Sequence, residues 1–316
     1  MSVSEALPLA LAHVGEALIP ELVVISGKGG TGKTSVVASF AVLAGGAVLA
    51  DCDVDAADLH LVLAPQIERR KVFISGHEAV VRPDDCEGCG DCLDVCRFDA
   101  LATRDGSSLP EVDPIACEGC GVCVHVCPLK AIDFVPRVCG EWFVSSTRCG
   151  PMVHARLGIA AENSGKLVST VRAEARRVAA QSGRGLILID GPPGIGCPVI
   201  SATTGAAGVL LVTEPSVSGE HDVGRALALT RHFDIPAAVC VNRWDLCPEV
   251  TERIEDSARE HGAEIAGRIR YDPSVTTAQI NGRTVVELGG PAADDIRRLW
   301  EHVNGWLTAS FHQADP

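Results

Sequence analysis

Short apolar runs that end in polar residues recur along the chain and predict the strands of a sheet. The runs lie at 22–26, 47–50, 186–189, 209–212 and 237–241. A stretch of helical composition follows the first run over 35–43, and further helical stretches lie between the other runs. Strands of a parallel sheet are buried on both faces and alternate with helices in βαβ units. We therefore expect an α/β fold with a mostly parallel sheet, helices on both faces and functional residues at the carboxyl ends of the strands.

A glycine-rich segment directly after the first run predicts a phosphate-binding loop. Its residues satisfy the pattern G-x-x-x-x-G-K-[ST] between a predicted strand and a predicted helix, and they are Gly27, Lys28, Gly29, Gly30, Thr31, Gly32, Lys33 and Thr34. In such a loop the backbone N–H groups cradle phosphate oxygens. Lys33 would reach the β- and γ-phosphates, Thr34 would bind Mg²⁺, and the adjacent Ser35 completes the nucleotide site. An ordinary glycine turn is the alternative, and the complete pattern argues against it.

The loop contains a second lysine, Lys28, which narrows the interpretation. The pattern K-G-G-x-x-K-[ST] from Lys28 to Thr34 resembles the deviant Walker A family of P-loop ATPases. This family includes the MinD and ParA ATPases, the Mrp-type cluster carriers and the nitrogenase iron protein. The resemblance implies a homodimer with ATP sandwiched at the interface, in which Lys28 reaches the partner's phosphates. Lys28 and Lys33 would then both act in ATP hydrolysis.

Two further segments resemble the switches of this family. Asp51-Cys52-Asp53 follows a predicted strand, and Asp190 begins the sequence Asp-Gly-Pro-Pro-Gly after another. The resemblance implies that Asp53 positions or activates the attacking water and that Asp51 lies near Mg²⁺. It also implies that Asp190 holds Mg²⁺ through water, while the rigid turn after it responds to the γ-phosphate. A buried or capping aspartate is the alternative for Asp51 and Asp53.

Recognition of the base rests on weaker patterns. Asn242 ends a predicted strand, and the resemblance places it on adenine. The following Arg243-Trp244-Asp245 also approximates the guanine-reading motif of GTPases, although this loop subtype is mostly ATP-using. The stretch 270–274, with Asp272, resembles the family's other base-side loop, and a plain turn is the alternative.

The cysteines are concentrated in one acidic segment. Eight of the fourteen lie between Cys86 and Cys127, and the segment 84–134 has eleven acidic and three basic residues, or 3 − 11 = −8 of the total charge of −14. Cys-Glu-Gly-Cys-Gly occurs in it twice, which is an internal repeat. We expect an inserted domain at 84–134, an ATPase domain formed by 21–83 and 135–316, and an N-terminal extension with a short helix at 1–20.

The spacing C-x2-C-x2-C-x3-C occurs twice in this segment and is typical of bacterial ferredoxins with two clusters. In that arrangement the fourth cysteine of each run binds the other cluster. One 4Fe–4S cluster would take Cys86, Cys89, Cys92 and Cys127, and the other Cys96, Cys117, Cys120 and Cys123. Two zinc sites are the alternative, since C-x2-C pairs also suit tetrahedral zinc.

A P-loop switch with a ferredoxin in its chain resembles the MinD-superfamily ATPases with an inserted ferredoxin domain. The resemblance implies an ATP- and Mg²⁺-binding homodimer that couples ATP hydrolysis to electron transfer through two 4Fe–4S clusters to a partner protein. The alternatives are an ATPase that assembles or carries iron–sulfur clusters or metallocofactors, and a redox-sensing positioning switch. The stretches 150–155 and 162–167 are typical of this subgroup, which makes His154 and Lys166 candidates for the path between nucleotide and cluster. The alternative is a surface histidine and a lysine at a helix start.

Of the six remaining cysteines, Cys197 stands seven residues after Asp190. The nitrogenase iron protein has a ligand of its intersubunit cluster at this offset, and a second one upstream, where this chain has Cys139 and Cys149. A third cluster that bridges the dimer through Cys149 and Cys197 is therefore a hypothesis. Buried structural thiols are the default.

Composition excludes several classes of partner. The net charge of −14 argues against a nucleic-acid binder or a protein that binds anionic membranes, because both need a basic face. The last apolar residues at helical spacing, from Ile296 to Leu307, share their helix with mixed charges, so we expect core packing rather than membrane contact. Residues 1–20 lack Lys and Arg, and no apolar run is long enough to span a bilayer. We expect a cytoplasmic protein whose clustered cysteines bind metal.

Overall fold

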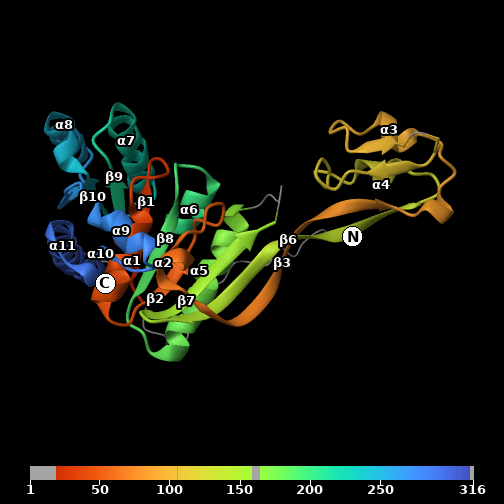
Figure 1. Ribbon diagram of the computed structural model, residues 1–316. Helices are drawn as coiled ribbons and strands as arrows, with labels where there is room; N and C mark the ends of the chain where they lie inside the picture. Colours follow the sequence, from red (N-terminus) through yellow and green to blue (C-terminus); the bar gives the residue numbers. More distant parts are fainter. Residues whose placement is uncertain (1–18, 105, 159–163, 314–316) are drawn as a thin grey trace.

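The computed structural model describes residues 19–104, 106–158 and 164–313. Residues 1–18, where we expect the N-terminal extension and its short helix, lie outside these ranges. The described residues form a nine-stranded sheet in the order β11-β10-β9-β1-β8-β2-β7-β6-β3 (Figure 1). The strands are β1 Glu21–Ser26, β2 Val48–Asp51, β3 Gln66–Val81, β6 Ile132–Thr147, β7 Gly150–Leu157, β8 Ile187–Pro193, β9 Gly208–Thr213, β10 Ala237–Asn242 and β11 Glu264–Ile269.

The seven strands from β11 to β7 are parallel, which confirms the expected α/β fold with a mostly parallel sheet. Each of the five apolar runs forms one of these strands. In β1 the side chains alternate between the two faces, with Val23 and Ile25 in one core and Leu22 and Val24 in the other. All four are fully buried, which is why the sequence shows a continuous apolar run rather than an alternating one.

Helices cover both faces of the sheet. Helices α5 (Ser164–Ser182), α6 (Cys197–Thr203), α7 (Val217–His232) and α8 (Pro248–Glu260) contribute to one core. The other core takes side chains from α1 (Lys33–Ala44), α2 (Leu59–Leu63), α9 (Ser274–Ile280), α10 (Val285–Leu288) and α11 (Pro291–Gln313). In α11 the side chains of Ile296, Leu299, Val303 and Leu307 are buried against the sheet, which confirms core packing for this helix. Within the described ranges no helix has the length and apolar character needed to cross a membrane.

The last two strands of the sheet, β3 and β6, form a long antiparallel ribbon that the sequence analysis does not predict. Gly140–Thr147 of β6 pair with β7, and the pairing ends where Gly140 meets Leu157, the last residue of β7. Residues 132–139 and their partners in β3 continue as two strands alone. Because β7 is parallel to β2, this free part of the ribbon leaves the carboxyl edge of the sheet, where the phosphate-binding loop also lies.

The far end of the ribbon carries the cysteine-rich segment, well separated from the helices around the sheet (Figure 1). It contains β4 (Leu101–Thr103), β5 (Pro110–Val112), α3 (Asp91–Asp94) and α4 (Val122–Val126), with a small core of its own. The two halves repeat one backbone conformation, since positive φ angles recur 31 residues apart, at Gly88, Gly90 and Asp99 and then at Gly119, Gly121 and Lys130. β3 ends at Val81, and Ile132, Asp133 and Phe134 belong to β6, so the segment between the strands, 82–131, begins and ends slightly earlier than the expected insert.

Candidate functional site

The phosphate-binding loop connects β1 to α1, as its sequence predicts. Gly32 has φ +94, and a Cβ atom at this position would lie 2.4 Å from Nδ2 of Asn242. The Asn242 amide donates a hydrogen bond to the Thr31 carbonyl over 2.8 Å. The side-chain amide of Asn242 therefore holds the loop and does not point to an open position for a base.

Lys33 lies at the centre of a buried charge network at the carboxyl ends of β2 and β8. Its Nζ is 2.7 Å from Oδ2 of Asp53 and 3.2 Å from Oδ1 of Asp190. The hydroxyl of Thr34 donates to the other oxygen of Asp190 over 2.7 Å. The structure thus brings together four residues that the sequence analysis assigned to phosphate, Mg²⁺ and water.

Burial and the neighbouring charges shift the pKa values of these groups. Burial raises the pKa of Asp190, and Lys33 and the Thr34 hydroxyl oppose that shift. Burial also raises the pKa of Asp51 well above its usual value, and the charge of Asp190 adds to the effect. For Lys33, burial acts to lower the pKa, but the charges of Asp190 and Asp53 outweigh it, so its pKa is raised. Three carboxylates share one lysine here, and a divalent cation would neutralise the excess charge.

Asp51 has a more specific position than the sequence suggests. One carboxylate oxygen accepts the backbone N–H of Asp53 over 3.2 Å, and the other accepts the N–H of Leu59 over 3.3 Å. Asp51 is fully buried and anchors both ends of the loop 53–58. It lies close enough to Asp190 and Lys33 to affect the site electrostatically.

Lys28 points away from this network and is held within its own subunit. Its Nζ lies 2.7 Å from Oε1 of Glu214, and it donates to the hydroxyls of Ser216 and Ser218 over 3.3 and 3.1 Å. Glu214 also accepts a hydrogen bond from Arg243 over 2.9 Å. No pattern in the sequence identified Glu214 as the partner of Lys28.

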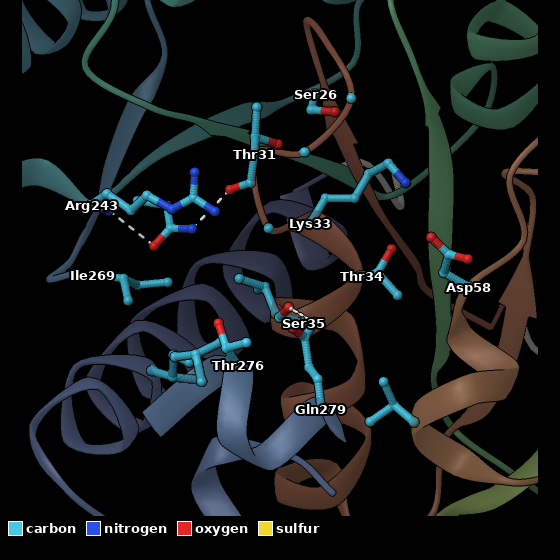
Figure 2. Close-up of a pocket in the computed structure, with 18 of the residues that line it drawn as sticks. Ser26, Thr31, Lys33, Thr34, Ser35, Asp58, Arg243, Ile269, Thr276 and Gln279 are labelled. Carbon is cyan, nitrogen blue, oxygen red and sulfur yellow. Dashed lines mark hydrogen bonds between the residues drawn. The ribbon is translucent and has the colours of Figure 1, made fainter. Parts of the chain in front are cut away.

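A cavity of about 630 Å³ opens beside the loop and has the size of a nucleotide site (Figure 2). Thr31, Lys33, Thr34 and Ser35 line its phosphate end. The Thr31 hydroxyl is buried without a hydrogen-bond partner among the described residues, as expected for a group that awaits a phosphate oxygen. The rest of the lining includes Arg243 directly after β10, Ile269 of β11, and Thr276 and Gln279 of α9, with the Gln279 amide bonded to the Ser35 hydroxyl (Figure 2).

Asp272 lines this cavity, but its carboxylate accepts backbone hydrogen bonds that hold the loop before α9 in place. Oδ1 accepts the backbone N–H of Ser274 over 2.9 Å, and Oδ2 accepts that of Ala292 over 3.4 Å. The hydrogen bonds with Ser274 lower the pKa of Asp272. This is the plain-turn role that the sequence analysis left open beside base binding.

In the cysteine-rich segment, the four cysteines of one expected ligand set line a shared cavity. Cys96, Cys117, Cys120 and Cys123 all line one small cavity, although Cys96 comes from the other half of the repeat. In the first set, Cys92 is close enough to Cys86 and Cys89 for their charges to raise its pKa, after the larger effect of burial. Cys127 accepts the backbone N–H of Ala131 over 3.3 Å. Backbone donors to cysteine sulfur are a feature of iron–sulfur sites.

No group of three or more His, Cys, Asp or Glu side chains in the described part of the chain could hold a metal ion. The two zinc sites weighed from the sequence therefore have no ligand set in this structure. A 4Fe–4S cube binds its thiolates on separate irons, so it needs the four cysteines around a cavity rather than around one point. Cluster ligation stays a prediction.

The proposed bridging pair is not brought together. Cys149 precedes β7, at the amino edge of the parallel strands, whereas Cys197 follows β8, at the carboxyl edge. Cys197 is exposed and Cys149 is half-buried. Cys139 lies in β6, where its thiol is buried and contacts the Ser75 carbonyl over 3.1 Å.

The two residues considered for the path between nucleotide and cluster lie in different surroundings. Lys166 is exposed in the first turn of α5, and His154 is buried in β7 rather than on the surface.

Comparisons with known proteins show what the chain is similar to in sequence and in fold. The family model described as the CobQ/CobB/MinD/ParA nucleotide binding domain matches residues 22–285. A Methanocaldococcus jannaschii protein, MJ0578, is 34% identical over 232 residues, which cover 72% of this chain and 79% of that protein.

Among solved structures, the cell division ATPase MinD of Pyrococcus furiosus superposes with a TM-score of 0.55 at 19% identity, covering 92% of this chain and all of MinD. The Pyrococcus horikoshii MinD complexed with Mg-ADP superposes with a TM-score of 0.53 at 20% identity, covering 93% and 99% of the two chains. At these identities the likeness shows a shared fold. The family match covers most of the chain and includes the phosphate-binding loop, Asp53 and Asp190, so the chain belongs to the CobQ/CobB/MinD/ParA family of nucleotide-binding domains.

Proposed function

We propose that this protein is a dimeric ATPase switch that couples ATP hydrolysis to electron transfer through two 4Fe–4S clusters to a partner protein. The observation that carries the proposal is the continuous ribbon of β3 and β6. It extends from the carboxyl edge of the sheet, where the phosphate-binding loop also lies, to a cavity lined by four cysteines. Both strands leave the sheet at the edge where the nucleotide cavity lies.

The chemistry at the phosphate end follows from the charge network. Lys33 is buried against Asp53 and Asp190, so its ammonium group is already in place for the β- and γ-phosphates. Thr34 and Asp190 would hold Mg²⁺, directly and through water. When phosphate replaces Asp53 as the partner of Lys33, the Asp53 carboxylate is free to orient the attacking water.

Lys28 supports the dimeric part of the proposal. It is half-exposed at the carboxyl edge of the sheet, and its bonds to Glu214 and the two serines are all within its own subunit. A partner's phosphates would compete with Glu214 for this lysine. Formation of the dimer would therefore exchange Glu214 for phosphate at Lys28.

The cysteine-rich segment supplies the redox part. Bound there, 4Fe–4S clusters carry one electron each at potentials set by charge, hydrogen bonds and exposure. The backbone repeat, the N–H bond to Cys127 and the cavity around Cys96, Cys117, Cys120 and Cys123 support this assignment. The net charge of −8 on 84–134 would steer a basic partner to this end of the molecule.

A cluster-carrier function is the second candidate. Cys89 and Cys120 are exposed, which would suit the release of a cluster to an acceptor protein. Electron transfer needs clusters that stay in place, whereas a carrier needs clusters that leave in response to ATP.

Anaerobic EPR of the reduced protein, recorded without nucleotide, with MgADP and with MgATP, tests the proposal. We expect two 4Fe–4S signals, with a spectrum or midpoint that MgATP changes in the wild type and not in Lys33→Ala, which loses its phosphate contact. Signals indifferent to ATP would contradict the coupling, and MgATP-stimulated transfer of iron to an apo-ferredoxin would then favour the carrier. Absence of cluster signals from protein reconstituted with iron and sulfide would overturn the redox assignment, while ATP hydrolysis would still test the nucleotide site.

A further inference from the structure

The loop after β2 separates the nucleotide cavity from a second cavity of similar size. The second cavity has a volume of about 610 Å³, against about 630 Å³ for the nucleotide cavity. Asp53, Ala56 and Asp58 line the nucleotide cavity, whereas Val54, Asp55 and Ala57 line the second one. The loop 53–58 therefore lies between the two cavities and contributes side chains to both.

The opposite wall of the second cavity is the root of the ribbon, and it presents a buried histidine. His154 of β7 is only 9% exposed, and its ring stacks on Phe143 of β6 with 5.0 Å between the ring centroids. Its Nε2 is 2.9 Å from the hydroxyl of Ser145. Within the described residues Nδ1 has no hydrogen-bond partner. Nδ1 is not one of the fully buried unpartnered atoms of the described residues, so a ligand atom or a water can reach it.

The charges around the cavity indicate what kind of ligand fits. Arg156 and His60 lie close enough to His154 for their charges to lower its pKa, after the larger effect of burial. Arg156 forms no ion pair with any described residue, and the acidic residue of the lining is Asp55. The rest of the wall is largely apolar, including Ile67 and Leu157. A basic end and an apolar body together suit an amphipathic anion.

We propose that this cavity binds a small organic anion with an apolar body, and that its occupancy changes the affinity of the neighbouring site for nucleotide. The anionic group would contact Arg156 and His60, a polar atom would meet Nδ1 of His154, and the apolar body would pack on Phe143 and Ile67. Coupling would pass through the loop 53–58, whose ends are held by the hydrogen bonds of Asp51. Such coupling is reciprocal, so nucleotide must change the affinity for the anion by the same factor.

The test uses 8-anilinonaphthalene-1-sulfonate as a probe, because it joins a sulfonate to an aromatic body. Isothermal titration calorimetry with the whole protein, with and without MgADP, should give one saturable site whose Kd changes at least about threefold with nucleotide. Arg156→Gln should weaken the probe about fivefold or more, because it removes the unpaired charge. Arg231→Gln is the matched control, an exposed arginine beside a separate cavity, and should leave the probe's Kd unchanged.

A second variant tests the cavity without changing its charge. Ile67 is 57% exposed on the outermost strand of the sheet, so Ile67→Trp should fill the cavity without disturbing the fold and should abolish probe binding. Weak binding at many sites, or binding unaffected by both Arg156→Gln and Ile67→Trp, would overturn the inference, as would a probe Kd indifferent to MgADP. The measurement needs neither hydrolysis nor clusters. Failure of MgADP to bind at all would instead contradict the proposed function.

Discussion

The hydroxyl of Thr34 donates to Asp190 over 2.7 Å, so two residues that would hold Mg²⁺ already touch each other. Lys33 bonds the other oxygen of the same carboxylate. The pair is therefore preorganised, so a Mg²⁺ ion bound by Thr34 directly and by Asp190 through water would not have to bring the two side chains together first.

Asp190 and Asp53 should separate cation binding from hydrolysis. Asp190→Asn removes the charge that would hold Mg²⁺, so Mg²⁺ should no longer tighten ATP binding, and hydrolysis should fall at least about 100-fold. Asp53→Asn should lower hydrolysis as strongly but keep MgATP binding, because it frees Lys33 from a salt bridge. Calorimetry with and without Mg²⁺, beside a phosphate-release assay, measures both effects. Equal loss of MgATP affinity in the two variants would contradict these roles.

Glu214 should restrain the dimer. Glu214→Gln weakens the hold on Lys28, so MgATP should form dimers at about two- to fivefold lower protein concentration, the range for a partly exposed ion pair. Lys28→Ala should bind ATP but stay monomeric. Sedimentation velocity across a concentration series with MgATP gives both results. Glu260→Gln, at an exposed glutamate in the last turn of α8, is the control and should behave as wild type.

The packing of the insert on the ribbon should depend on Gly119. A Cβ atom there would lie 2.1 Å from the carbonyl oxygen of His77 in β3, whereas one at Gly90 would meet open space. Both glycines have positive φ, so Gly90→Ala and Gly119→Ala share a conformational cost of about 1 kcal/mol. Gly119→Ala adds a clash with backbone and should lose reconstituted iron during gel filtration, while Gly90→Ala retains more of it. MgATP affinity should be normal in both, and equal iron retention would show that the clash is relieved.

The buried imidazole of His154 should make stability depend on pH. Burial lowers its pKa to about 4, below the value of about 6.5 in an unfolded chain. The unfolded state therefore takes up the proton first, and the free energy of unfolding should fall as the pH drops from about 6.5 towards 4. Urea denaturation at pH 7, 6 and 5 should show a smaller fall for His154→Gln than for wild type. His221→Gln, at an exposed histidine, should follow wild type, and parallel curves for all three proteins would contradict the assignment.

The buried strands and the phosphate-binding loop were predictable because the constraints on them act on consecutive residues. A strand such as β1, covered on both faces, must be apolar throughout, and a loop that wraps phosphate must be rich in glycine. The ribbon was not predictable in this way. Most of β3 is exposed, and its sequence mixes charged and apolar residues without a regular period.

Contacts between segments far apart in the chain also could not be predicted from the sequence. Lys28 and Glu214 are 186 residues apart and meet only because β1 and β9 are neighbours in the sheet. The second cavity is likewise formed by the loop after β2 and the root of the ribbon, which no local motif connects. The sequence marked His154 as part of a typical stretch, but only the fold shows what surrounds it.

The length of the ribbon would magnify any change of angle at its root. Its free part spans residues 132–139 of β6, with a length of about 26 Å at the usual rise per residue. A tilt of about 10° at its root would move the cysteine-rich end by about 5 Å, an arc that follows from the length. Movements too small to rearrange the nucleotide cavity would therefore become displacements comparable to a side chain at the far end. The length of the ribbon sets how strongly a change at the sheet is magnified.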